Sequence, residues 1–145
     1  YGSDLSARQR YQMCVCISLI SLSLSSLSVF IVNAIFFRPR PFVGHEVNLL
    51  FYQPTDSSFP ANSIAVTFAV AASVWGVNRL AGTVLLIATS LYGFSRIYSG
   101  VHYPADVVSG ALIAFVVTYL LFRVKHTLSL VLIKVIKAGR IFCLA

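Results

Sequence analysis

The sequence predicts an all-α integral membrane protein, on three observations. Hydrophobic residues occupy 58% of the 145 positions and charged residues only 10%, and the mean hydropathy is +0.86. Apolar runs of membrane-spanning length recur along the chain. Basic residues lie at the ends of those runs, as they do at membrane surfaces. We therefore expect residues 1–145 to form a single membrane-embedded bundle with about four membrane helices.

The net charge of +7 does not indicate a nucleic-acid partner. A nucleic-acid-binding domain of this size carries a continuous basic face on polar helices or strands. Basic residues that flank apolar runs instead favour membrane lipids and an anionic ligand as partners. The sequence has no Cys or His spacing typical of a metal site, so we expect no metal and no cofactor. Nothing in it indicates an oligomeric state.

The first membrane helix is expected over residues 11–37, an uncharged apolar run longer than the roughly 20 residues that span a bilayer core. It contains several serines, which allow close helix packing and can bond to the preceding turn. They are Ser18, Ser21, Ser23, Ser25, Ser26 and Ser28. The prolines of Arg38-Pro39-Arg40-Pro41 end this helix, and a polar connection follows to about Pro60.

Three further membrane helices are expected over residues 62–78, 80–98 and 104–123, the first of them short for a full span. Residues 128–142 place three basic residues at intervals of three on an otherwise apolar segment, namely Lys134, Lys137 and Arg140. That pattern is typical of an amphipathic helix lying at the membrane surface.

The basic residues also predict the orientation, because cytoplasmic loops are enriched in Lys and Arg. Arg8 and Arg10 precede the first helix, Arg79 lies between the second and third, and Arg123 and Lys125 follow the fourth. All of these positions fall on one side of the membrane. The polar segments 38–60 and 96–106 therefore meet on the opposite, outer side.

Arg40 and Arg96 lie beside helix ends on this outer side, where a guanidinium group is costly unless it is paired or binds a ligand. The chain has few acids for internal ion pairs, only Asp4, Glu46, Asp56 and Asp106. We therefore favour phosphate binding over interface anchoring for Arg40 and Arg96. For Arg38 the two interpretations are evenly matched.

His102 precedes a helix that Pro104 is well placed to begin, and Asp106 lies in its first turn. A carboxylate there could reach back to the imidazole, fix its tautomer and make its other nitrogen a better nucleophile. Alternatively, Asp106 only complements the helix N-terminus and His102 is an interfacial histidine. On spacing alone, the second interpretation is the simpler one.

The segment Ser58-Phe59-Pro60-Ala61-Asn62-Ser63 leads into the second membrane helix. Backbone N–H groups at a helix N-terminus form a natural anion site. Asn62 or Ser63 is expected as the N-cap, whose side chain accepts a bond from the first turn. Capping and anion binding are compatible at this position.

Taken together, these segments resemble the type 2 phosphatidic acid phosphatase family, membrane enzymes that remove phosphate from lipids without a metal. The motif formed by Ser95-Arg96, His102 and Asp106 is complete. The resemblance runs from the first helix to about Arg123. The family bundle usually has six membrane helices and four are visible here, which leaves open that an N-terminal pair precedes them.

Within the family, segments 38–45 and 56–60 look most like bacterial undecaprenyl pyrophosphate phosphatases associated with bacitracin resistance. The resemblance implies that His102 is a nucleophile forming a phosphohistidine and that Asp106 orients it, with Arg40, Arg96 and Ser95 as phosphate ligands. It further implies conversion of undecaprenyl diphosphate to the monophosphate at the outer face of a bacterial cytoplasmic membrane. That reaction recycles the cell-wall lipid carrier.

The chain departs from the family pattern at two motifs. Asn33 stands seven positions before Arg40, where the family usually has Lys, and Ala61-Asn62-Ser63 follow Pro60 in place of Ser-Gly-His. In the family that histidine protonates the leaving group. Ser63 cannot act as an acid at neutral pH.

Three explanations for this loss remain open. The chain could bind lipid headgroups without turnover, or His45 in the same outer segment could donate the proton, although it also reads as an ordinary loop histidine. Alternatively, a diphosphate substrate needs little help, because its leaving group departs more readily than an alkoxide. General acid catalysis is worth roughly 10² to 10⁴ in rate. We therefore expect a preference for lipid diphosphates, with phosphatidylglycerophosphate and phosphatidic acid as alternative substrates.

Overall fold

The computed structural model describes residues 7–44 and 53–124, and within these two ranges the regular structure is helical without any strand. Its elements are α1 (Ala7–Ile35), α2 (Pro41–Gly44), α3 (Asn62–Trp75), α4 (Arg79–Tyr98) and α5 (Pro104–Arg123). The predicted all-α fold class is confirmed.

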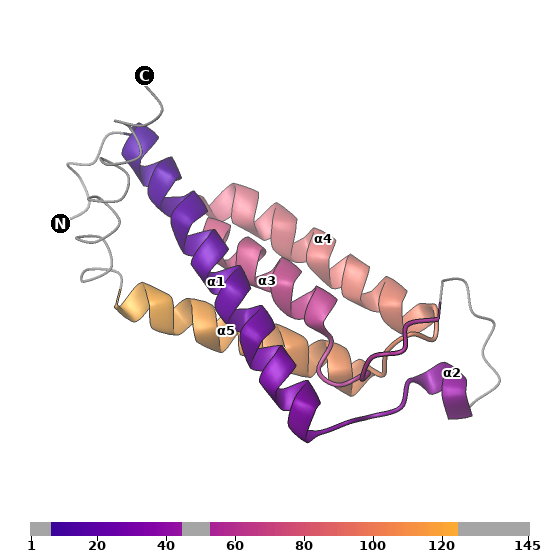
Figure 1. The fold of residues 1–145 in the computed structure, drawn as a ribbon. Helices are drawn as coiled ribbons and strands as arrows, with labels where there is room; N and C mark the ends of the chain where they lie inside the picture. The colour runs from indigo at the N-terminus through magenta and orange to yellow at the C-terminus, as the bar shows by residue number, and fades with distance from the viewer. Residues whose placement is uncertain (1–6, 45–52, 125–145) are drawn as a thin grey trace, which may run out of the picture.

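Helix α3 is the centre of the bundle. It packs against α1, α4 and α5, and α1 also packs against α5, whereas α4 and α5 touch each other little. The C-terminal ends of α1 and α4 gather with the N-terminal ends of α3 and α5 at one end of the bundle, near the one-turn helix α2 (Figure 1). The described parts of the two polar segments, residues 38–44 and 53–60 on one and 96–106 on the other, therefore lie at the same end of the bundle, as predicted.

Three of the described helices are long and apolar enough to cross a membrane, over Gln9–Ile35, Arg79–Tyr98 and Pro104–Arg123. Their outward faces expose large apolar side chains such as Leu80, Phe94 and Leu112, which suits contact with lipid. The chain is thus an integral membrane protein. Helix α3 has 14 residues, or roughly 21 Å at 1.5 Å per residue, and is shorter than a full span, as expected.

Small residues allow the helices to pack closely. A core cluster is formed by Ala61, Ile64, Phe68, Ala69 and Ala114. The hydroxyls of Ser21 on α1 and Thr118 on α5 share a buried hydrogen bond of 2.6 Å, and Ser28 donates to the carbonyl of Leu24 at 2.8 Å. These contacts match both roles predicted for the serines of the first helix.

The start of α3 is fixed against the start of α5. The N–H of Ala61 donates to the carbonyl of Asp106 at 3.0 Å. A Cβ on Gly110 would lie only 2.6 Å from the carbonyl oxygen of Ala61, so the approach depends on the absence of a side chain there. The packing of α3 against α5 consequently sets the distance between the polar segments at this end of the bundle.

Several predicted boundaries need correction. Helix α1 ends at Ile35, before the prolines, and α2 forms within the segment expected to be an irregular connection. The N-cap of α3 is Ala61 and makes no side-chain cap bond, so the prediction of Asn62 or Ser63 as the N-cap is wrong. Backbone pairing between α3 and α5 sets this start, which local sequence does not reveal. His45 and the helix expected over 128–142 lie outside the described residues.

Candidate active site

The loop between α4 and α5 carries His102. Gly100 has a positive φ of 69°, a conformation that glycine adopts without strain. The carbonyl of Arg96 then accepts hydrogen bonds from the N–H groups of Val101 at 3.2 Å and His102 at 3.4 Å. The end of α4 therefore fixes the backbone on which the imidazole is carried.

Asp106 lies fully buried in the first turn of α5. One carboxylate oxygen, Oδ2, accepts the N–H of Tyr103 at 2.9 Å, which caps the helix. The same oxygen accepts the hydroxyl of Ser58, and Oδ1 accepts Nη1 of Arg38 at 2.9 Å. The capping interpretation of Asp106 is thus correct, and the carboxylate additionally joins three segments of the site.

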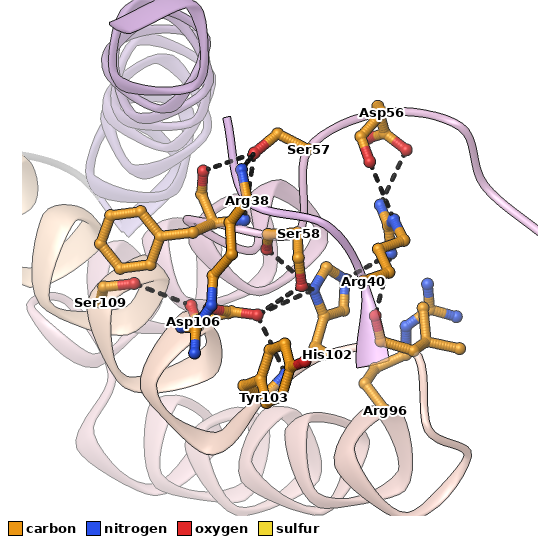
Figure 2. Close-up of polar contacts among 12 residues, drawn as sticks. Arg38, Arg40, Asp56, Ser57, Ser58, Arg96, His102, Tyr103, Asp106 and Ser109 are labelled. Carbon is orange, nitrogen blue, oxygen red and sulfur yellow. Dashed lines mark hydrogen bonds and ion pairs between the residues drawn. The ribbon is translucent and has the colours of Figure 1, made fainter. Parts of the chain in front are cut away.

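The ring of His102 is 4% exposed, and its surroundings define the tautomer. Nδ1 lies 3.0 Å from the carbonyl oxygen of Ser58, which can only accept, so Nδ1 carries the proton. Nε2 lies 3.4 Å from Nη1 of Arg40, which can only donate, so Nε2 presents its lone pair. Asp106 Oδ2 is 4.0 Å from Nδ1, beyond a direct hydrogen bond. Ser58 lies between them (Figure 2).

Arg40 is buried, and the described residues engage all three of its nitrogens. Nε and Nη2 donate to the carbonyl and the carboxylate of Asp56 at 3.0 and 2.7 Å, and Nη1 donates to the carbonyl of Val101 at 3.2 Å. The expectation that few cations would find an internal carboxylate is wrong here, because Asp56 on the same polar segment folds back onto Arg40. Asp56 is 67% exposed, so a dissolved anion could replace it.

Arg96 is also buried, in the last turn of α4. Figure 2 shows Arg40 and Arg96 on the same side of the His102 ring. Two buried guanidinium groups facing one imidazole create a region of positive potential. Such a region suits a phosphoryl group, since Arg binds phosphate in a bidentate fashion.

The pKa of His102 reflects this environment. The pKa of the ring is lowered from its usual 6.5 to about 4, chiefly because burial disfavours the charged form and also because of the positive charge of Arg40. The hydrogen bond to the Ser58 carbonyl raises the pKa in part, Arg96 adds a further lowering, and Asp106 adds a smaller raising. The imidazole is therefore neutral near pH 7. A neutral ring with its Nε2 lone pair turned toward Arg40, and with Arg96 on the same side of the ring, can attack an electrophilic phosphorus.

The remaining predicted phosphate ligands are more dispersed. Arg38 is partly exposed, with its guanidinium 4.1 Å from the centre of the Tyr103 ring and Nη1 on Asp106. Ser95 is exposed on α4, and its hydroxyl donates to the carbonyl of Tyr92 at 2.7 Å. Asn62 is exposed in the first turn of α3. The geometry therefore brings Arg38 into the cluster, whereas the described contacts of Ser95 and the exposure of Asn62 do not connect these two residues to His102.

Asn33 and Ser63 occupy the two positions that depart from the family pattern. In each, the side-chain oxygen is buried, and it has no hydrogen-bond partner within the part of the chain that the structure describes. Such groups normally find a partner.

Ser57 and Ser58 had no separate role in the sequence analysis. The Ser57 hydroxyl accepts the N–H of Arg38 at 3.1 Å and contacts the carbonyls of Phe36 and Phe59, while Ser58 N–H donates to the Arg38 carbonyl at 2.9 Å. The contacts of Ser58 to His102 and Asp106 span more than forty positions. No local spacing could have indicated them.

The family model for the PAP2 superfamily matches residues 13–130. The chain belongs to this superfamily. It is 36% identical over 99 residues to the undecaprenyl-diphosphatase BcrC of Bacillus subtilis (strain 168), covering 68% of this chain and 51% of that protein. It is 30% identical over 114 residues to an undecaprenyl-diphosphatase of Sulfolobus acidocaldarius, covering 74% and 52%. The chain thus spans about half the length of these curated relatives.

Two solved PAP2-type structures are similar in fold. The structure of LpxE from Aquifex aeolicus aligns with a TM-score of 0.67 and 27% identity, over 81% of this chain and 78% of that one. The PAP2 type phosphatidylglycerolphosphate phosphatase of Bacillus subtilis aligns with a TM-score of 0.62 and 20% identity, over 77% and 59%. The second likeness supports the PAP2 fold alone.

Proposed function

We propose that this PAP2 chain carries the active site of a lipid phosphatase that hydrolyses a polyprenyl diphosphate, undecaprenyl diphosphate first among them, to the monophosphate. The observation that carries the proposal is the orientation of His102. Its Nε2 lone pair is directed toward Arg40, with Arg96 on the same side of the ring. The relatives named undecaprenyl-diphosphatase support the choice of substrate.

In the proposed reaction the terminal phosphoryl group binds Arg40 and Arg96, exchanging with the carboxylate of Asp56. Nε2 of His102 attacks phosphorus in line. The N–P bond forms while the bond to the bridging oxygen breaks, and its electron pair leaves with the lipid monophosphate. The two guanidinium groups stabilise the charge on the transferring phosphoryl group.

The proton on Nδ1 stays on the ring throughout this first step. Its bond to the Ser58 carbonyl stabilises the positive charge that the imidazole acquires. Water then attacks the phosphohistidine, the P–N bond breaks, and the electron pair returns to Nε2 as inorganic phosphate leaves. Asp106, also near the ring, favours the charged form.

Ser63 limits the range of substrates in this proposal. No acid replaces the family histidine at this position, so a leaving group must depart with little protonation. A lipid monophosphate meets that demand, because it is a far better leaving group than the alkoxide released from phosphatidic acid. His45, outside the described residues, remains a proposed proton donor.

The active site is proposed to face outward from a bacterial cytoplasmic membrane. Arg10, Arg79 and Arg123 lie toward the end of the bundle away from His102, as the helix order requires, and positive charge favours the cytoplasmic side. A lipid diphosphatase at that face would regenerate the monophosphate form of the lipid carrier that cell-wall synthesis needs. Because the sequence resembles phosphatases associated with bacitracin resistance, we also propose that the chain contributes to such resistance.

The test is a phosphate-release assay on the full chain in detergent, with undecaprenyl diphosphate, phosphatidylglycerophosphate and phosphatidic acid as substrates. We expect turnover of the diphosphate, loss of roughly 10³-fold or more in His102→Ala, and an acid-labile phosphoprotein after rapid quenching. Arg10→Gln, an exposed change at the far end of α1, is the matched control. Undiminished turnover in His102→Ala overturns the proposal.

A second candidate is headgroup binding without turnover. The buried side-chain oxygens of Asn33 and Ser63 favour it, because they stand where the family has a cation and an acid. In the same assay this alternative predicts saturable binding of the diphosphate and no phosphate release. Turnover in Ser63→His alone would show that only the acid is missing.

A further inference from the structure

The hydroxyl of Ser58 makes contacts that the proposed reaction does not use. Ser58 is fully buried and follows Ser57 in the segment that runs into α3. Its backbone is tied at N–H to the carbonyl of Arg38 at 2.9 Å. The segment that follows α1 therefore holds the backbone of Ser58 in place, independently of its contacts with His102 and Asp106.

Two groups of Ser58 face the imidazole of His102. Its carbonyl oxygen lies 3.0 Å from Nδ1, and its hydroxyl oxygen lies 3.5 Å from the same nitrogen. The hydroxyl is also hydrogen-bonded to Oδ2 of Asp106. Because an ionised carboxylate only accepts, the hydroxyl proton points to Asp106 and its lone pairs are left to face Nδ1–H.

The direct path from Asp106 to the ring is longer. Oδ2 is 4.0 Å from Nδ1, and that oxygen already accepts the hydroxyl of Ser58 and the N–H of Tyr103. A carboxylate at this separation cannot orient the ring by a hydrogen bond of its own. Its influence on the ring must pass through Ser58 or through space.

We propose that Ser58 is the positioning residue of the site, which couples Asp106 to His102. Its carbonyl selects the tautomer with the proton on Nδ1, and its hydroxyl transmits the charge of Asp106 to that edge of the ring. This role rests on the proposed function of His102 as nucleophile. As Nε2 bonds to phosphorus, the positive charge on the ring is met by the carbonyl, the hydroxyl and the carboxylate behind it.

The neighbouring serine provides the control. Ser57 is also buried and its hydroxyl also bridges backbone groups, namely those of Phe36, Arg38 and Phe59. Within the described residues, the hydrogen bonds of its hydroxyl do not involve His102 or Asp106. Loss of the Ser57 hydroxyl disturbs the same segment without touching the proposed coupling.

The experiment compares Ser58→Ala with Ser57→Ala in the full chain in detergent. We expect Ser58→Ala to lower kcat roughly 10- to 100-fold, since bonds to charged groups are worth more than neutral ones, with KM nearly unchanged. Ser58→Thr, which keeps the hydroxyl, restores most of the rate. A loss in Ser58→Ala no larger than that in Ser57→Ala overturns the proposal.

A second measurement does not depend on turnover. The imidazole ¹⁵N resonances of His102, followed against pH, report its tautomer and pKa directly. Removing the hydroxyl cuts the link to Asp106, so in Ser58→Ala the titration of His102 moves to lower pH, whereas in Ser57→Ala it stays at the wild-type position. Identical titrations in both variants overturn the coupling even if His102 proves to be the nucleophile.

A double-mutant cycle completes the test. If Ser58 acts through Asp106, the loss in Ser58→Ala combined with Asp106→Asn is much smaller than the product of the separate losses. Independent effects count against the coupling. Should His102→Ala leave turnover intact, the proposed function fails while the ¹⁵N titration still decides the role of Ser58.

Discussion

The two sides of the candidate site differ in how completely their polar groups are satisfied. On the α5 side, His102 and Asp106 are buried, and each makes several hydrogen bonds within the described residues. On the α1 and α3 side, the side-chain oxygens of Asn33 and Ser63 are buried without a partner in the described ranges. Buried polar groups are costly unless paired. The polar groups of the first side are fixed by hydrogen bonds, whereas the second side buries polar oxygens at positions where the family pattern has charged or titratable residues.

The largest expected effect comes from removing a buried charge beside His102. Arg40→Gln removes a buried cation beside Nε2 of His102 and should lower kcat/KM for the diphosphate roughly 10²- to 10³-fold, as losses of transition-state electrostatics do. Arg40→Lys should recover little, because a point charge cannot reproduce the planar contacts. Steady-state kinetics with Arg10→Gln as control would measure this. A loss below tenfold would contradict the proposed role of Arg40 beside His102.

Restoring charge on the other side should have the next largest effect. Ser63→His supplies a proton donor where the family has one, and should raise turnover of phosphatidic acid roughly 10- to 100-fold, at the lower part of the range for general acids. The gain for undecaprenyl diphosphate should be smaller. Ser63→Gln adds bulk without an acid and serves as the control. Equal gains in both variants would mean that packing, not protonation, limits this side.

The lowered pKa of His102 predicts a pH dependence of stability. The folded-state pKa is about 4 and the unfolded value is 6.5, so between these values the unfolded chain binds more protons and stability falls as the pH falls. Above about pH 6.5 this contribution is constant. Thermal unfolding in detergent at pH 7.5, 6 and 4.5 should show this loss of stability as a falling unfolding temperature. His102→Gln should reduce it, and an unchanged pH profile in that variant would assign the loss to other groups.

The smallest effect is expected at Asp56. Because this carboxylate is mostly exposed, its pair with Arg40 contributes little, about 0 to 1 kcal/mol. Asp56→Asn should tighten inhibition by inorganic phosphate no more than about fivefold, by releasing Arg40 to the anion. Phosphate inhibition constants for the wild type, Asp56→Asn and Asp56→Glu would show it. Weaker inhibition in Asp56→Asn would mean that Asp56 organises Arg40 for phosphate rather than competing with it.

Sequence reasoning recovered what depends on local pattern. Hydropathy and the position of Pro104 predicted the span of α5, and the recurrence of apolar runs predicted a helical membrane bundle. Spacing placed His102 and Asp106 near each other, but the predicted direct contact does not form, because Nδ1 and Oδ2 are 4.0 Å apart. Placement beside helix ends identified Arg40 and Arg96 as neighbours of the site.

What sequence reasoning missed depends on contacts between distant segments. Arg38 and Asp106 are 68 positions apart, and Ser58 and Asp106 are 48 apart. The cap of α3 was assigned to a polar residue, but pairing of Ala61 with α5 sets that helix start. The sequence gives the type of each polar side chain, but not which distant group that side chain contacts in the fold.

The shortness of α3 has a consequence for how a lipid reaches this site. A hydrocarbon core of about 30 Å exceeds the roughly 21 Å that its 14 residues span. If Trp75 and Arg79, whose guanidinium carbon lies 3.6 Å from the centre of the Trp75 ring, mark one membrane surface, the start of α3 lies several ångströms short of the opposite surface. The phosphate of a lipid that binds there must then lie deeper in the membrane than the headgroups of the surrounding lipids. A small headgroup such as a bare diphosphate can reach that depth more easily than a bulky one. Under the proposed function, the depth of the site would therefore contribute to substrate selectivity.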